Sequence, residues 1–124
     1  MLLDSWIWIE IFKRTPKSSL LVERIRNEKR YTSTLSLAEV AFWCTQNGLN
    51  PHQYTENIQK NATVLHVNEP VAIEAGKRLA VLRPQIRGIG MVDAIIYTQA
   101  QSANMPVLTG DPHFRNLPGV QFIG

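Results

Sequence analysis

The first five residues constrain the fold more than any other stretch of the chain. Leu2 and Leu3 are typical of a short, fully buried strand, and Asp4 follows them directly. The next residues, 5–12, are apolar on almost every side, which predicts a buried helix rather than a surface loop. A strand that ends in Asp and runs into such a helix puts the carboxylate at the carboxyl edge of a sheet. Open α/β sheets bind their ligands at that edge.

The rest of the chain alternates between short apolar or β-branched runs and longer segments with helical spacing. Strands are predicted at 2–3, 31–33, 63–67, 106–109 and 120–123, and helices at 5–12, 16–28, 34–47, 51–61, 69–83 and 91–103. Strands that alternate with helices predict an α/β fold, a three-layer α/β/α sandwich with a short, mostly parallel central sheet. The chain has no repeats or linkers, so we expect a single domain over residues 1–124.

Composition limits the class of protein. An apolar fraction of 44% is ordinary for a globular chain. Cys44 is the only cysteine, which excludes an intramolecular disulfide and favours a reducing compartment. No stretch approaches the roughly 18 apolar residues of a membrane span, and the N-terminal run lacks a basic leader. The three histidines have no paired spacing typical of a structural zinc site. We therefore expect a cytoplasmic protein with no membrane contact.

The net charge is +3, and seven of the thirteen basic residues fall between Lys13 and Arg30. One interpretation is a solvated helix face, the usual outcome for a charge run. The other is a basic rim that guides a phosphate backbone. The charge run alone does not decide between them.

Four acids are predicted to meet at the carboxyl edge of the sheet: Asp4, Glu39, Asp93 and Asp111. Each follows a predicted strand or opens a predicted helix, and in a parallel α/β sheet these positions share one edge. Converging carboxylates repel one another, so some must take up protons unless a cation lies among them. All-oxygen ligands favour Mg²⁺ or Mn²⁺ over zinc. The pattern therefore predicts a divalent metal site.

Each acid also has a local explanation as a helix cap. Asp4 and Asp111 stand where an N-cap residue would stand, and Pro112 fits the first helical position. Asp93 lies in a first turn, where a negative charge is favoured. The spacing of Ser36 and Glu39 is that of a capping box. These local explanations remain open at the level of sequence.

Four segments occur in the order of a known family's motifs. They are Leu2-Leu3-Asp4-Ser5, Ser36-Leu37-Ala38-Glu39-Val40, Gly90-Met91-Val92-Asp93-Ala94-Ile95-Ile96 and Leu108-Thr109-Gly110-Asp111-Pro112-His113-Phe114. In these segments, and over essentially its whole length, the chain resembles PIN domains, and within them the small VapC-like toxins. The resemblance implies a Mg²⁺- or Mn²⁺-dependent endoribonuclease that is the toxin of a type II toxin–antitoxin pair.

The resemblance also implies roles for the acids. The catalytic positions are Asp4, Glu39, Asp93 and Asp111. Asp4 and Asp93 are expected to hold the principal ion, and Asp111 that ion or a second one. Glu39 is expected to orient or deprotonate the attacking water, with a 3′-hydroxyl and a 5′-phosphate as products.

Three positions depart from the family pattern, and they leave the number of metal ions open. Ser5 stands where the family usually has threonine, and Trp6 where it commonly has asparagine. His113 stands where many members carry another acidic or polar residue.

Four further residues are candidates for substrate binding: Ser5, Thr109, Arg87 and Arg115. The two hydroxyls are suited to a carboxylate or a phosphate, or simply cap turns, and the two arginines contact RNA or are ordinary surface charge. Expected partners are the RNA substrate, a protein antitoxin that sends an Arg or Lys into the acidic pocket, and a second copy of the chain. Residues 6–12 either contribute to that homodimer or belong to the core.

Other classes fit less well. A haloacid-dehalogenase-type phosphatase needs a second Asp two residues after the first, where this chain has Trp6. A receiver domain needs an Asp at the end of its third strand, where this chain has His66-Val67-Asn68. Two alternatives remain: a non-catalytic PIN-like module that binds RNA or protein, and a stand-alone RNA-processing nuclease without an antitoxin.

Overall fold

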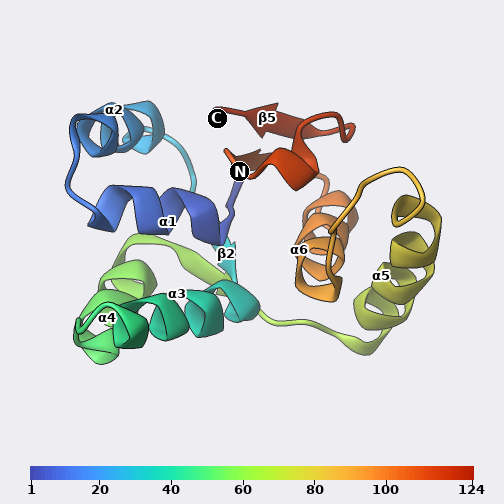
Figure 1. Ribbon diagram of the computed structural model, residues 1–124, viewed down its shortest axis with the longest axis horizontal. Coiled ribbons are helices and arrows are strands. Elements are labelled where there is room, and N and C mark those ends of the chain that lie inside the picture. The colour runs from blue at the N-terminus through green and yellow to red at the C-terminus, as the bar shows by residue number, and fades with distance from the viewer.

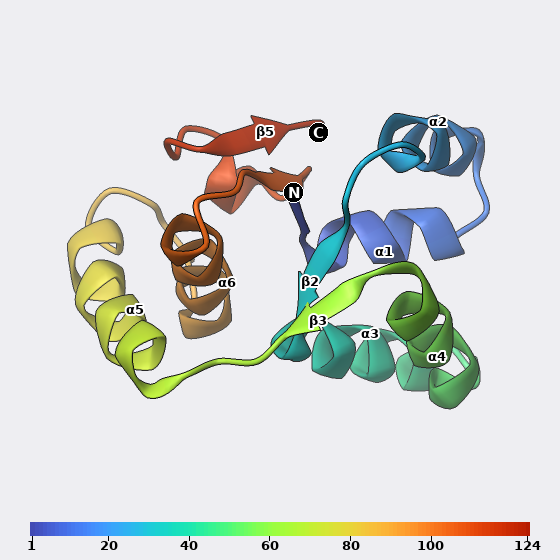
Figure 2. The ribbon, with the colours of Figure 1, turned by 180° about the vertical axis from the view of Figure 1, so that it is seen from behind.

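The computed structural model describes residues 1–124 and has a five-stranded, wholly parallel sheet at its centre (Figures 1 and 2). The strands are β1 (Leu2–Leu3), β2 (Tyr31–Ser33), β3 (Thr63–Leu65), β4 (Val107–Thr109) and β5 (Val120–Phe122). They lie in the order β3-β2-β1-β4-β5, and every neighbouring pair is parallel. The predicted α/β fold is confirmed, with a sheet that is entirely rather than mostly parallel.

Six helices cover the two faces of this sheet. They are α1 (Ser5–Phe12), α2 (Pro16–Ile25), α3 (Thr34–Gln46), α4 (Pro51–Asn61), α5 (Glu69–Leu82) and α6 (Met91–Ser102). Helices α1 to α4 lie together on one side, on the left in Figure 1, and α5 and α6 pack against each other on the other side. A short 3₁₀ helix, η1 (Pro112–Phe114), follows β4. No helix is both long and apolar enough to cross a membrane.

The two central strands are buried from both sides, which is why they are so short and so apolar. Leu3 and Leu108 pack into the core formed with α1 to α4, whereas Leu2 and Val107 pack against α6. Successive side chains of a strand point to opposite faces. Two residues therefore suffice for β1 to contribute to both cores, and the next residue, Asp4, emerges at the carboxyl edge.

Two predicted boundaries are wrong by a few residues, and in both cases side-chain hydrogen bonds to the last carbonyls explain the difference. Helix α2 ends at Ile25 instead of 28, because the Arg30 guanidinium donates to the carbonyls of Ile25 and Arg26 at 3.1 Å each. Strand β3 ends at Leu65 instead of 67. The carbonyl of Leu65 accepts from Thr34 Oγ1 at 3.0 Å and from Gln99 Nε2 at 3.2 Å.

Helix α1 is mainly a core helix. Trp8 is 2% exposed, and its indole N–H donates to Thr32 Oγ1 at 3.1 Å. The Phe12 ring stacks on Trp8 and meets Tyr54 edge-on, with ring centroids 6.3 and 4.9 Å apart. Core packing is thus the correct interpretation for Trp8, whereas Trp6 and Phe12 are partly buried and have surface left for a partner.

Trp6 also fixes the connection between β4 and η1. Its six-membered ring lies against the backbone of Gly110, so closely that a Cβ at position 110 would stand 2.4 Å from the ring. Side chains larger than hydrogen have no room there. The ring therefore holds in place the loop that carries the next residue, Asp111.

We predict that Gly110→Ala lowers the free energy of unfolding by about 1–3 kcal/mol, the usual cost of forcing extra volume into a packed site. Gly76→Ala is the matched control, because a Cβ in the middle of α5 meets nothing within 4 Å. That change removes a helix glycine and should stabilise by about 0.5–1 kcal/mol. Urea denaturation of both variants measures the difference, and equal midpoints would contradict the role given to Trp6.

Candidate metal and active site

The order of the strands reverses at β1. From this central strand the chain proceeds outward to β2 and β3 on one side, and β4 and β5 lie on the other. Such a switch point leaves a crevice at the carboxyl ends of the strands. Asp4 follows β1 directly, Asp111 follows β4 after one glycine, Glu39 lies in the second turn of α3, and Asp93 in the first turn of α6.

The four predicted acids converge on this crevice. Burial is the largest cause of the raised pKa values of Asp4, Glu39 and Asp93, and repulsion among the acids adds to it. The repulsion comes from Glu39 and Asp111 at Asp4, from Asp93 and Asp111 at Glu39, and from Asp111 at Asp93. Residues from four separate elements thus form one acidic cluster, which a cation would neutralise.

Asp4 is the most deeply buried member of the cluster. It is 3% exposed, and burial is the main reason that its pKa rises from 3.8 to about 7. Thr109 Oγ1 donates to Asp4 Oδ2 at 2.7 Å and partly offsets the rise in pKa. Asp4 occupies the N-cap position of α1 but makes no side-chain capping bond; at the start of α1 only the backbone N–H of Ser5 acts on its carboxylate, and it lowers the pKa. Capping therefore does not explain this residue.

Glu39 is held by a hydroxyl and does not cap its helix. Ser5 Oγ donates to Glu39 Oε1 at 2.5 Å. Burial is the largest cause of the raised pKa of Glu39. The cap of α3 is Ser33, whose Oγ accepts from Leu35 N at 3.1 Å, and Ser36 Oγ has no hydrogen-bond partner. The capping-box explanation for Ser36 and Glu39 is therefore wrong, because the N-cap is Ser33, three residues before the position that motif requires.

Asp93 and Asp111 do act as caps. Asp93 Oδ2 accepts from Gly90 N at 3.1 Å, and Asp111 Oδ1 accepts from His113 N at 3.0 Å. Burial is again the main cause of the raised pKa of Asp93. Each cap engages one carboxylate oxygen with one hydrogen bond, and a carboxylate has further lone pairs on both oxygens for a cation. Capping and metal binding are thus compatible at these two positions.

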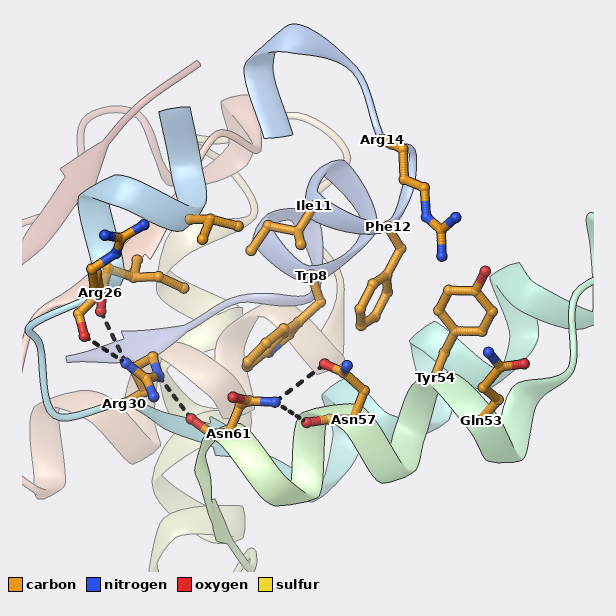
Figure 3. Close-up of a pocket in the computed structure, with 12 residues that line it drawn as sticks. Trp8, Ile11, Phe12, Arg14, Arg26, Arg30, Gln53, Tyr54, Asn57 and Asn61 are labelled. Carbon is orange, nitrogen blue, oxygen red and sulfur yellow. Dashed lines mark hydrogen bonds between the residues drawn. The ribbon is translucent and has the colours of Figure 1, made fainter. Parts of the chain in front are cut away.

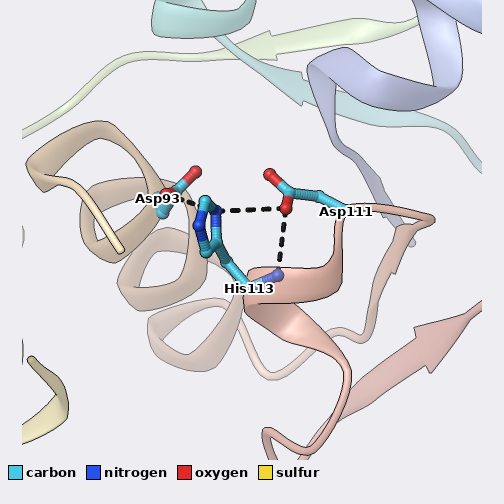
Figure 4. Close-up of side chains that lie close together, drawn as sticks. All are labelled: Asp93, Asp111 and His113. Carbon is cyan, nitrogen blue, oxygen red and sulfur yellow. Dashed lines mark hydrogen bonds and ion pairs between the residues drawn. The ribbon is translucent and has the colours of Figure 1, made fainter. Parts of the chain in front are cut away.

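His113 joins the cluster, although the sequence analysis treated it only as a departure from the family pattern. Its Nδ1 lies 3.1 Å from Asp111 Oδ1 and 3.5 Å from Asp93 Oδ2 (Figure 4). The spacing Asp111-Pro112-His113 could have indicated this contact, because the side chain two residues after an N-cap Asp, with a proline between them, turns back toward the cap. Potential metal-ligating atoms of Asp93, Asp111 and His113 all lie within 4.8 Å of one another.

The four candidate substrate contacts divide into two kinds. Ser5 and Thr109 bond to carboxylates, and Thr109 Oγ1 also accepts from Asp111 N at 3.0 Å. The Arg115 guanidinium stacks over the Phe122 ring at 4.8 Å. Arg87 is exposed in the connection before α6 and lines a surface hollow with Gly88 and Gly90. Of the two arginines, Arg87 is the one without a partner of its own.

The donors present fit a divalent cation. Three buried or half-buried carboxylates have raised pKa values, because too few positive charges and hydrogen bonds stabilise their charged forms. The imidazole Nδ1 of His113 is buried and has no hydrogen-bond partner, because neither nearby carboxylate oxygen meets hydrogen-bond geometry. A cation among these atoms would relieve both defects.

We predict that Asp4→Asn stabilises the metal-free protein at high pH. The folded protein keeps the Asp4 proton up to about pH 7, whereas the unfolded chain loses it near 3.8. The neutral Asp4 carboxyl therefore makes its full contribution to the free energy of unfolding at low pH, and this contribution is lost as pH rises toward 7. The variant should equal wild type near pH 4 and exceed it by up to about 4 kcal/mol at pH 8.

Denaturant unfolding in the presence of chelator, from pH 4 to pH 8, measures this difference. Glu56→Gln, an exposed change in α4, is the control and should follow wild type. If Asp4→Asn and wild type differed in free energy of unfolding by the same amount at every pH in this range, the raised pKa of Asp4 in the folded protein would be refuted.

Comparison with known proteins gives the same fold and a family. The family model for the PIN domain matches residues 1–120. No curated protein sequence matches the chain. Among solved structures, the Mycobacterium tuberculosis toxin VapC20, described as cleaving the sarcin–ricin loop, superposes with a TM-score of 0.81 at 16% identity, covering 99% of this chain and 98% of that one.

Two toxin–antitoxin structures are also similar. VapBC-1 from nontypeable Haemophilus influenzae has 26% identity and a TM-score of 0.74, covering 98% of this chain and 95% of that one. A toxin–antitoxin complex from Klebsiella pneumoniae has 21% identity and a TM-score of 0.74, covering 97% and 94%. Since the family model spans nearly all of the sequence and the sheet order and acidic crevice accord with it, the chain belongs to the PIN domain family.

Proposed function

We propose that this protein is a metal-dependent endoribonuclease and the toxin of a type II toxin–antitoxin pair. The observation that carries the proposal is the convergence of four carboxylates at the switch point of a PIN-domain sheet; in three of them, Asp4, Glu39 and Asp93, burial and mutual repulsion raise the pKa. RNA as the substrate is supported by the similar fold of VapC20, a toxin described as cleaving the sarcin–ricin loop. A cytoplasmic location follows from that substrate.

Asp4, Asp93 and Asp111 are the proposed ligands of Mg²⁺ or Mn²⁺. When bound, the ion lowers the pKa of a coordinated water and neutralises charge that builds on the phosphoryl group. Thr109 positions two of these ligands, since its hydroxyl donates to Asp4 and accepts from the backbone N–H of Asp111. Ser5 and Thr109 are thus proposed to position carboxylates rather than to bind RNA, and Arg87 to contact the RNA backbone.

Glu39 is the proposed general base. Its raised pKa brings its basicity closer to that needed near neutral pH, and the bond from Ser5 fixes one of its two oxygens. The other oxygen accepts a proton from water as the water oxygen bonds to phosphorus. The bond between phosphorus and the 3′ oxygen breaks, and the leaving 3′ oxygen takes a proton from solvent water, which gives a 3′-hydroxyl and a 5′-phosphate.

We predict that Asp93→Asn lowers RNA cleavage at least about 100-fold, because a missing ligand removes several kcal/mol of charge stabilisation. Asparagine retains an oxygen to accept from Gly90 N, so the cap of α6 should persist. Cleavage of a mixed RNA pool is measured with Mg²⁺, with Mn²⁺ and with chelator. Glu69→Gln, also in the first turn of a helix but in α5, is the matched control and should cleave like wild type.

Cleavage that chelator does not abolish, or that Asp93→Asn retains, would contradict the proposed site. A folded wild type that neither binds the metals nor cleaves RNA would instead favour the non-catalytic module.

A groove between α1, α2 and α4 is the proposed site of the antitoxin (Figure 3). It encloses about 510 Å³, with Trp8, Ile11 and Phe12 among its apolar lining. Arg14 and Arg26 stand at its edge. An apolar floor with a basic rim suits an apolar segment that carries acidic side chains.

This groove lies at the opposite end of the strands from the acids. Arg30 and Asn61, which also line it, lie one and two residues before β2 and β3. The basic residues between 13 and 30 are thus poorly placed to guide RNA to the acidic crevice. Several are already paired, Arg26 with Glu23 at 3.0 Å and Arg24 with Glu28 at 3.4 Å.

We predict that a small protein encoded immediately upstream copurifies with wild type and that Val22→Asp weakens its binding at least about tenfold. Val22 lines the groove and is 42% exposed, so a charge there must be desolvated on binding. Leu20→Asp, on the same helix, 72% exposed and outside the groove, is the control. Equal copurification of the two variants would refute the groove as the docking site.

Absence of any such neighbour would favour the stand-alone nuclease and leave the metal-dependent chemistry in place. Homodimerisation also remains part of the proposal, and a monomer in size measurements at high concentration would contradict it.

A further inference from the structure

We propose that His113 binds the same divalent ion through its Nδ1 and makes the site prefer Mn²⁺ to Mg²⁺. This inference rests on the proposed function, because it concerns the ion of the nuclease site. It goes beyond that function by adding a nitrogen donor to a set of ligands that are otherwise carboxylates.

The first support is the state of the Nδ1 atom. It is buried and lacks a hydrogen-bond partner, although Asp111 Oδ1 and Asp93 Oδ2 lie only 3.1 and 3.5 Å away. Buried polar atoms in folded proteins almost always have a partner, and each exception calls for an explanation. A cation shared by the nitrogen and the two carboxylates supplies the missing partner.

The second support is the spacing of the donors. Neighbouring ligands of an octahedral ion with bonds of about 2.1 Å stand about 3 Å apart. The distances from Nδ1 to the two carboxylate oxygens are of that size. In Figure 4 the ring of His113 stands between the two acids, with its edge toward both.

The third support is that the orientation of the ring is built into the backbone. His113 N donates to Asp111 Oδ1, which folds η1 back toward the carboxylate, and the buried Phe114 anchors the next position. On the far side, Nε2 faces Gly88, where a Cβ would stand 3.1 Å away. Gly88 has φ +84°, a conformation that favours glycine, so the connection before α6 leaves room for the ring.

The chemistry of the donor decides which ion gains. Mg²⁺ is a hard cation that takes oxygen ligands in near-ideal octahedral geometry. Imidazole is a common ligand of first-row transition metals. A site with one imidazole among its carboxylates therefore discriminates against Mg²⁺ relative to Mn²⁺.

The test is pulsed electron paramagnetic resonance of Mn²⁺ bound to the whole protein, because a directly coordinated imidazole gives ¹⁴N modulation. We expect this modulation in wild type and its replacement by a ¹⁵N signal when histidine is isotopically labelled. His113→Asn replaces the nitrogen donor by an oxygen, so Mn²⁺ should still bind but without ¹⁴N modulation. The ratio of Mn²⁺ to Mg²⁺ affinity, measured by competition, should fall about tenfold.

His66→Asn is the matched control. His66 also follows a strand at the carboxyl edge, but its Nδ1 lies 3.2 Å from Thr34 Oγ1, outside the acidic cluster. Its ¹⁴N modulation and ion preference should equal those of wild type.

The outcomes separate this inference from the proposed function. Bound Mn²⁺ without ¹⁴N modulation in wild type, or an unchanged ion preference in His113→Asn, overturns the role of His113. The nuclease proposal then survives if Asp93→Asn abolishes Mn²⁺ binding. Failure of wild type to bind Mn²⁺ at all overturns both.

Discussion

The burial of the Asp4 carboxyl is the constraint on which the arrangement of the site depends. A carboxylate held out of water at the end of a central strand is unfavourable in its charged form, and its pKa of about 7 expresses that cost. One hydroxyl, that of Thr109, partly compensates, and it belongs to the neighbouring strand. Through the same hydroxyl, Asp4 is connected to Asp111. The pairing of β1 with β4 therefore sets the geometry of two of the four acids.

Convergence of the other two acids follows from the topology. Helices α3 and α6 begin near the carboxyl ends of the strands, so Glu39 and Asp93 in their first two turns approach the crevice from opposite sides of the sheet. Each carboxylate accepts one hydrogen bond that holds it in place: Glu39 from the Ser5 hydroxyl and Asp93 from the backbone N–H of Gly90. The fold thus brings like charges together at the one place where strand order provides a crevice.

Local sequence patterns were sufficient for the elements and for the acids, but not for the way each acid is held. The Leu2-Leu3 strand, the largely apolar helix after it and the helix at 51–61 could all be predicted, because burial and capping act over a few residues. The Ser36–Glu39 spacing misled, because the choice of Ser33 as cap depends on where β2 ends. Arg30 reaches back to the end of α2 because the chain turns before β2, and His113 meets Asp93 because η1 turns its side chain toward α6. Periodicity carries no information about either contact.

Helix α1 gives a physical reason why one partner can act on two surfaces. Asp4 immediately precedes its first residue, and Phe12, its last, lies in the groove. An eight-residue helix is about 12 Å long, a distance that about four extended residues span. A segment seated in the groove and continuing along α1 would therefore reach the acidic crevice within a few residues. A basic side chain at its end would meet the charge that a metal ion otherwise neutralises. In the proposed toxin, the short length of α1 would therefore allow one partner segment both to dock in the groove and to suppress metal binding.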